Sequence, residues 1–122
     1  MKKVLIVDDI GALRKHVMRL IVELGFQCQF SEASNGKEGL EMAKKGKFDL
    51  YLLDWQMPEM TGIELLKALK ENPRTRDVPA VMFTDQSKIS NVEEAMSLGA
   101  VGYLSKPFDI NKVDHKLHKY LA

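Results

Sequence analysis

Short apolar runs alternate with amphipathic segments along the whole chain, five of each. The runs are rich in Val, Ile, Leu and Phe, and residues 4–7 (VLIV) form one with no polar interruption. Continuous runs of this length are typical of strands that are buried on both faces of a sheet. The sequence predicts strands at residues 4–7, 28–33, 48–53, 79–83 and 101–104.

Signals for helix starts and stops bracket the segments between these runs. Apolar residues recur at helical spacing from Leu13 to Leu24, and Gly25 follows where a left-handed residue would end the helix. In three of the four other segments, a Glu stands three residues after the predicted N-cap residue, as in a capping box. Three of the other segments are preceded by residues that favour helix N-caps, namely Asn35, Thr61 and Ser90, and in the last segment apolar residues keep helical spacing from Asp109 to residue 122. Three of the segments end at Gly46, Asn72-Pro73 and close to Gly99.

Strands that alternate with helices predict a parallel sheet covered on both faces, because a parallel connection must cross over and usually does so through a helix. The fold class is therefore a doubly wound α/β sandwich. No Pro/Gly/Ser-rich linker, internal repeat or low-complexity tract interrupts residues 1–122. We expect one domain over this range.

Composition and charge exclude several classes of protein. Hydrophobic residues make up 45% of the 122 residues and the formal net charge is +1, which is unlike a disordered chain. Near-neutral charge gives no footprint for direct nucleic-acid binding, and no apolar run has the length of a membrane helix. Cys28 is the single cysteine, so the chain forms no internal disulfide. We expect a cytoplasmic monomer without membrane insertion.

Polar side chains follow the predicted strands. Ligands of open α/β sheets bind beyond the carboxyl ends of the strands, so these side chains are candidates for a site. Gathered carboxylates repel one another unless a cation is shared, and an all-oxygen ligand set favours Mg²⁺. In the alternative interpretation, the first two aspartates only cap the first helix. The second strand is followed by nothing distinctive; the other strands are followed by Asp8-Asp9, Asp54, Thr84-Asp85 and Ser105-Lys106-Pro107.

In combination, four of these features resemble the receiver domain of two-component response regulators, the CheY-like family. The features are Asp8-Asp9, Asp54 in the sequence DWQMP, Thr84, and Lys106-Pro107. The resemblance covers the whole chain and preserves their order and spacing. It implies a stand-alone receiver with a flavodoxin-like (βα)5 fold, whose five-stranded parallel sheet has the order 2-1-3-4-5.

The resemblance also implies a role for each matched acidic residue. Asp54 would be the phosphoacceptor, a carboxylate nucleophile that takes a phosphoryl group from a histidine kinase or a small phosphodonor. Asp9 and Asp54 would bind Mg²⁺ directly, and Asp8 would bind it mainly through water. Gln56 would add its backbone carbonyl as a further ligand.

Three other residues would respond to the phosphoryl group. Lys106 would pair with a phosphoryl oxygen, aimed by a cis bond to Pro107 in family members. The Thr84 hydroxyl would move to bond the phosphate and leave space for the ring of Tyr103. The output surface would be the fourth helix, fifth strand and fifth helix, and it would bind a downstream target such as a flagellar motor switch protein.

Three other functions are weighed against this one. An aspartyl-phosphate hydrolase often carries a second acidic residue two positions after its nucleophile, where this chain has Gln56. A flavin-binding domain would want a phosphate loop after the first strand, where Asp8 and Asp9 would repel a phosphate. A receiver that signals by binding, without phosphorylation, is suggested by Asp85, because family members usually have a small residue there.

Asp85 generates the first testable prediction. A carboxylate beside the switch hydroxyl would narrow access to the site, repel an incoming phosphoryl group or add a metal ligand; the alternative is a loop aspartate that only faces solvent. We expect Asp85→Ala to speed phosphorylation by acetyl phosphate, measured as the rate of phosphoprotein formation. An unaltered rate would remove this role for Asp85.

Overall fold

The computed structural model describes residues 1–55, 57, 59–85, 89–107 and 109–122. Its strands all run parallel in the order β2-β1-β3-β4-β5, so the doubly wound (βα)5 sandwich and its sheet order are confirmed. The strands are β1 (Lys2–Val7), β2 (Cys28–Ala33), β3 (Leu50–Asp54), β4 (Ala80–Asp85) and β5 (Gly102–Lys106). The helices are α1 (Gly11–Glu23), α2 (Gly36–Lys45), α3 (Gly62–Glu71), α4 (Ile89–Ser97) and α5 (Ile110–Leu121).

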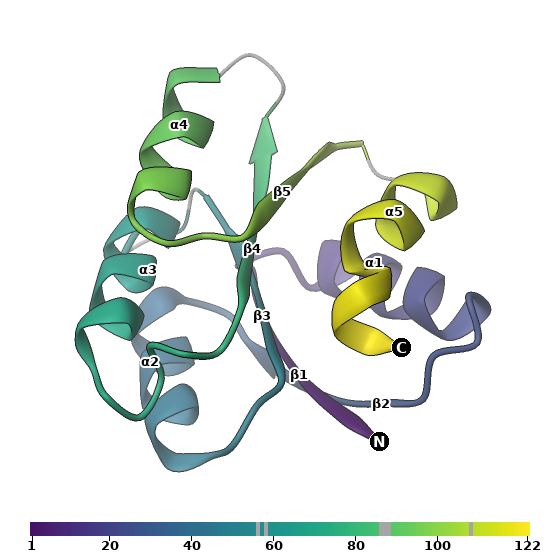
Figure 1. The fold of residues 1–122 in the computed structure, drawn as a ribbon, viewed down its shortest axis with the longest axis horizontal. Coiled ribbons are helices and arrows are strands. Elements are labelled where there is room, and N and C mark those ends of the chain that lie inside the picture. Colours follow the sequence, from purple (N-terminus) through teal and green to yellow (C-terminus); the bar gives the residue numbers. More distant parts are fainter. Residues whose placement is uncertain (56, 58, 86–88, 108) are drawn as a thin grey trace.

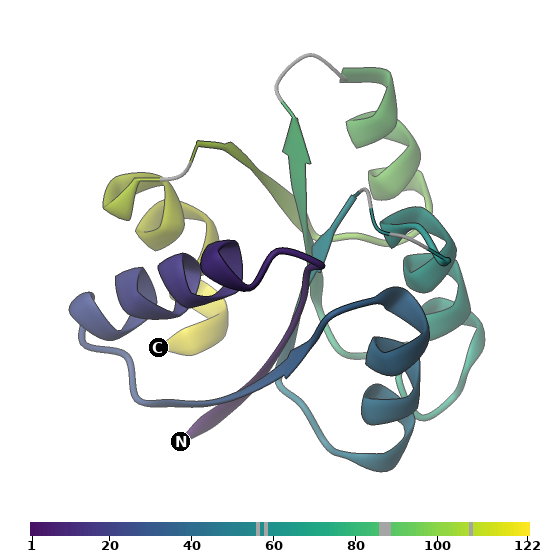
Figure 2. The same ribbon diagram turned by 180° about the vertical axis from the view of Figure 1, so that it is seen from behind.

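The sheet separates two helical layers. Helices α1 and α5 cover one face, and α2, α3 and α4 cover the other (Figure 1; Figure 2 shows the molecule from behind). Successive strand residues feed the two cores in turn: Leu5 and Val7 pack toward the three-helix layer, and Val4 and Ile6 toward α1 and α5. Burial on both faces accounts for the uninterrupted apolar runs. No helix in the described part of the chain is long and apolar enough to cross a membrane.

Several strand ends differ from the predicted ones because strand pairing is not local. β4 and β5 each continue to their last polar residues, since Thr84 pairs with Ser105 and Asp85 with Lys106. The sequence predicted that these four residues follow the strands, but they are part of the strands.

The third strand begins two residues later than predicted. The Lys3 backbone N–H donates to the Asp49 carboxylate (2.8 Å), while the Asp49 N–H donates to the Lys3 carbonyl (2.7 Å). The Asp49 side chain thus takes the place of a backbone acceptor, and the regular ladder between β1 and β3 starts at the pair Val4 and Leu50.

Most of the predicted helix ends are confirmed. The carboxamide oxygen of Asn35 caps α2, as predicted, and the carboxylate of Asp109 caps α5 in addition, each accepting from a backbone N–H at 2.8 Å. Thr61 forms the expected capping box with Glu64. Gly25 and Gly99 adopt the left-handed conformation, with φ of 89° and 108°, which suits residues that follow a helix.

The predicted cap at Ser90 is wrong, because Ser90 lies inside α4, which already includes Ile89. The apolar spacing of Ile89, Val92 and Ala95 is itself helical.

The buried Tyr51 leads to a prediction about alkaline stability. Burial raises the pKa of Tyr51 from 10.0 to about 12, because the phenolate loses its solvation. Folding therefore favours neutral Tyr51, and this contribution is complete below the unfolded pKa and is lost as the pH rises from 10.0 toward about 12.

When the pH is raised from about 9 to about 11, the free energy of unfolding of the wild-type protein should fall by about 1.4 kcal/mol more than that of Tyr51→Phe. Urea unfolding at the two pH values measures both losses. Equal losses in the two proteins would contradict this account of Tyr51.

Candidate functional site

Two buried aspartates lie at the carboxyl ends of the neighbouring strands β1 and β3: Asp8 directly follows β1, and Asp54 is the last residue of β3. The register between β1 and β3 pairs Val7 with Leu53, so Asp8 and Asp54 each come next in the chain. Asp8 is fully buried and Asp54 is 4% exposed. The register of two parallel strands, whose paired residues 4–7 and 50–53 are all buried, therefore brings two carboxylates to the same edge of the sheet.

The structure brings three carboxylates together at this edge, as the sequence predicted. Oxygens from Asp8, Asp9 and Asp54 all lie within 4.8 Å of one another, with Asp9 exposed and the other two buried. Carboxylates at such separations repel strongly where water is excluded. The three oxygens form an acidic, all-oxygen donor set, which fits a hard divalent cation such as Mg²⁺.

The alternative in which Asp8 and Asp9 only cap the first helix is not supported. The N-cap residue of α1 is Ile10, whose side chain makes no capping hydrogen bond. One oxygen of Asp8 accepts from the Ile10 backbone N–H at 2.9 Å, which closes a tight turn ahead of the helix. Asp9 is thereby presented at the surface beside the two buried carboxylates.

A close approach by α3 supports the end of β3. The Gly62 N–H donates to the Trp55 carbonyl (2.8 Å), and a Cβ at Gly62 would lie only 2.0 Å from the Asp54 carbonyl oxygen. Glycine is therefore required at the first position of α3. Trp55 donates its own N–H to Phe83 of β4 (3.1 Å), so the backbone after Asp54 is held from two sides.

The other predicted site residues are described in part. Thr84 is the fifth residue of β4, one step beyond the pair Asp54 and Phe83. Lys106 ends β5 and pairs with Asp85. The side chains of Thr84, Asp85 and Lys106, and all of Gln56, lie outside the described residues, so the roles predicted for them stay predictions.

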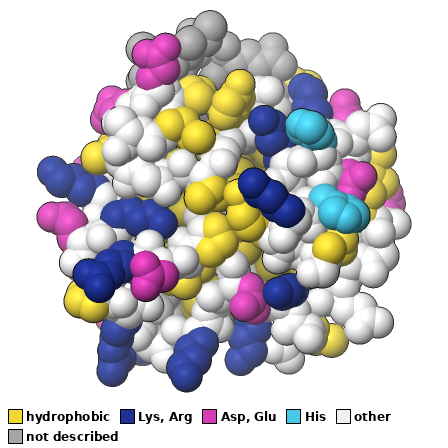
Figure 3. Space-filling view, viewed as in Figure 1, with side chains coloured by type: hydrophobic (Ala, Val, Ile, Leu, Met, Phe, Trp, Pro, Cys, Tyr) yellow, Lys and Arg dark blue, Asp and Glu magenta, His cyan; other side chains and the backbone are white. Residues whose placement is uncertain are grey.

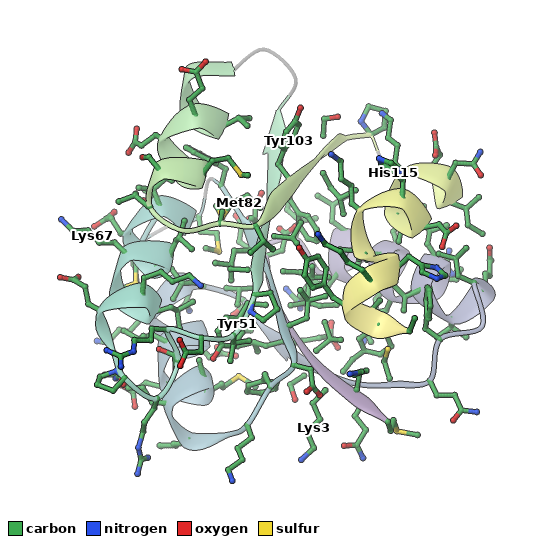
Figure 4. The ribbon with its side chains drawn as sticks, viewed as in Figure 1. Lys3, Tyr51, Lys67, Met82, Tyr103 and His115 are labelled. Atoms are coloured by element: carbon green, nitrogen blue, oxygen red, sulfur yellow. The ribbon has the colours of Figure 1, made fainter. Side chains whose placement is uncertain are left out.

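Tyr103 does not belong to the carboxylate cluster. It lies on the edge strand β5, where it pairs with Met82 of β4. Its side chain lines a hollow of about 360 Å³ between β5 and α5, together with His115 (Figure 4). The Lys116 ammonium lies 5.0 Å from the centre of the tyrosine ring, a cation–π distance. At 37% exposure, the ring can take part in a surface contact.

Sequence reasoning missed two residues beside the acidic edge. Arg14 of α1 donates to the backbone carbonyl of Asp8 and to the carboxylate of Glu32. Glu32 lies on β2, the strand whose end seemed to carry nothing distinctive. No local sequence pattern links residues 14 and 32. The one sequence feature that points to this contact is Gly11, one turn before Arg14, because the absence of a side chain there leaves room for the guanidinium.

Comparison with known proteins identifies the family. The family model described as "Response regulator receiver domain" matches residues 4–118. This chain belongs to the response regulator receiver family. The receiver domain is 38% identical to the chemotaxis protein CheY of Pseudomonas aeruginosa over 117 residues, which cover 96% of this chain and 94% of that protein.

Solved structures agree with the fold of this receiver domain. Chemotaxis protein CheY4 of Vibrio cholerae superposes with a TM-score of 0.88 at 33% identity, over 99% of both chains. The receiver domain of the sensor histidine kinase PA1611 from P. aeruginosa has a TM-score of 0.85 at 20% identity, covering 98% of this chain and 97% of its own. A magnesium ion is coordinated in the active-site cleft of that protein. The flavodoxin-like sandwich is thus confirmed.

The contact at Gly62 generates a prediction for this receiver domain. Alanine favours helices over glycine, so Gly62→Ala would stabilise α3 if space allowed. Because the Asp54 carbonyl must move instead, we expect a loss of about 1–3 kcal/mol in the free energy of unfolding.

Gly102→Ala is the matched control, since a Cβ there has no neighbour within 4 Å. Urea unfolding of both variants measures the effect. Equal stabilities for the two alanine variants would show that α3 does not press on the end of β3.

Proposed function

We propose that residues 1–122 form one receiver domain that works as a phosphorylatable switch, accepting a phosphoryl group on Asp54 from a histidine kinase in a Mg²⁺-dependent step. The observation that carries this proposal is the convergence of Asp8, Asp9 and Asp54 at the carboxyl edge of the sheet. Membership of the response regulator receiver family supports it. Asp54 is the residue that accepts the phosphoryl group, because it is the last residue of β3 and the backbone that follows it is bonded to the start of α3.

In the transfer step, a carboxylate oxygen of Asp54 attacks the phosphorus of a phosphohistidine. The new oxygen–phosphorus bond forms as the phosphorus–nitrogen bond breaks, and the imidazole leaves with the electron pair and takes up a proton. Asp8, Asp9 and the Gln56 carbonyl would hold the cation together with Asp54. When bound, Mg²⁺ offsets the negative charge that gathers on the phosphoryl oxygens. Lys106 pairs with one of these oxygens.

The output of the switch passes through the surface of α4, β5 and α5. Among the described side chains of this surface, Met96, Val101 and Tyr103 are apolar and exposed. Figure 3 shows apolar side chains over β5, with lysine and histidine side chains of α5 beside them. A phosphoryl group on Asp54 attracts the Thr84 hydroxyl, and the space it vacates admits the ring of Tyr103, which changes this surface.

The partner on this surface is a downstream target protein with an acidic binding segment. Lys112 and Lys116 line the hollow beside Tyr103 and supply the complementary charge. The relatives from P. aeruginosa and V. cholerae are chemotaxis proteins, so we propose chemotaxis-type signalling, with a flagellar motor switch protein as the target class. A hydrolase is less well supported, because Gln56 offers no second acid.

Trp55 provides the test of the phosphoacceptor, since it follows Asp54 directly. Mg²⁺ and then a small phosphodonor should each change the fluorescence of this single tryptophan. Asp54→Asn should abolish the response to the phosphodonor, because the amide is not a nucleophile.

Asp77→Asn is the control for loss of one negative charge. Asp77 is exposed in the loop before β4, at the opposite edge of the sheet, and this variant should respond like wild type. A phosphodonor response that persists in Asp54→Asn would overturn the proposal. A receiver that acts without phosphorylation would give the Mg²⁺ response alone.

A further inference from the structure

Arg14 connects the acidic edge to a neighbouring strand. Its Nη1 donates to the backbone carbonyl of Asp8, and its Nε donates to Glu32 Oε1 at 2.9 Å. The second oxygen of Glu32 accepts from Lys15 Nζ at 2.7 Å. Two consecutive residues of α1 are thus tied to one carboxylate on β2, but only Arg14 also reaches the backbone of the acidic turn.

The surroundings hold the Arg14 side chain in this position. The side chain is only 17% exposed, whereas that of Lys15 is 60% exposed. A Cβ on Gly11 would lie 3.3 Å from Arg14 Nη2, so the glycine keeps space for the guanidinium. Hydrogen bonds from Lys15 and Arg14 lower the pKa of Glu32, which keeps this carboxylate charged as the acceptor that orients Arg14.

The bond to the Asp8 carbonyl acts on the peptide plane between Asp8 and Asp9. The Asp8 N–H donates to Ala33 of β2 (3.1 Å), and the Asp8 side chain accepts from Ile10. Arg14 supplies the third restraint, a charge-assisted bond in a fixed fork geometry. The orientation of this peptide decides where the exposed Asp9 carboxylate emerges relative to the two buried ones.

We propose that Arg14 is a positioning residue for the Mg²⁺ site, oriented by Glu32, and that it pre-sets the Asp8–Asp9 peptide for cation binding. This inference rests on the proposed function. It makes a counterintuitive prediction, because removal of a cation near an acidic site should strengthen Mg²⁺ binding if charge alone mattered. Loss of the positioning bond should weaken binding instead.

The test is a Mg²⁺ titration followed by Trp55 fluorescence, with calorimetry as an independent readout. Arg14→Met should raise the Mg²⁺ dissociation constant about tenfold, as loss of outer-shell partners of metal ligands does. Lys15→Met is the matched control, because it removes an equal charge from the same carboxylate without touching Asp8. Its constant should equal that of wild type or be lower.

A further variant separates positioning from charge. Glu32→Gln would raise the dissociation constant by loss of a negative charge as well as by loss of the acceptor that orients Arg14, so the deciding variant is one that keeps the charge at position 14. Arg14→Lys keeps the charge but lacks the fork, and we expect it to resemble Arg14→Met. The rise in Tm on adding saturating Mg²⁺, measured against EDTA, reports on the site even where a variant lowers the Tm in EDTA.

The outcomes distinguish this inference from the proposed function. A Mg²⁺ constant for Arg14→Met within about twofold of wild type, or an equal weakening in Lys15→Met, would overturn the positioning role while leaving the switch intact. Should Arg14→Met fail to unfold cooperatively in urea, Arg14→Lys, which keeps the charge, decides by the same criterion. A wild-type chain with no saturable Mg²⁺ response would overturn the proposed function, and the inference with it.

Discussion

The register between β1 and β3 is the constraint on which the rest of the structure depends. Both strands are buried on both faces, so no neighbouring register could be adopted without exchanging the residues that face the two helical layers. The same register places Asp8 and Asp54 one step beyond the last apolar pair. The packing of an apolar core thus forces like charges together at a buried edge, where they repel unless a cation or a partner offsets them.

Other features of the chain serve to hold this edge in place. On one side, α3 approaches the end of β3 so closely that only glycine fits at Gly62. On the other, the turn after β1 is held by Ala33 of β2 and by Arg14 of α1. These contacts come from both helical layers and from neighbouring strands. A site built in this way needs little reorganisation when a ligand binds, which favours tight and selective binding.

Local signals in the sequence were sufficient for most elements. The apolar runs, the caps at Asn35 and Thr61 and the stop at Gly25 act within one turn or one strand, so they can be read without the fold. The convergence of the aspartates also followed, because the carboxyl ends of parallel strands share an edge. The ends of β4 and β5 could not be predicted, since each extends only by pairing with the other. The contact of Arg14 with Glu32 joins residues 18 positions apart, and it depends on how α1 lies across β2.

If the buried acidic edge acts as proposed, Asp54 becomes a phosphoacceptor once a cation is bound. Borohydride reduces an aspartyl phosphate to homoserine, which marks the modified residue permanently for peptide mass mapping. The protein would be treated with acetyl phosphate, with and without Mg²⁺, then reduced and digested. We expect homoserine in place of Asp54, formed only when Mg²⁺ is present. Homoserine at Asp8 or Asp9, or an equal yield at Asp54 without Mg²⁺, would contradict this proposal.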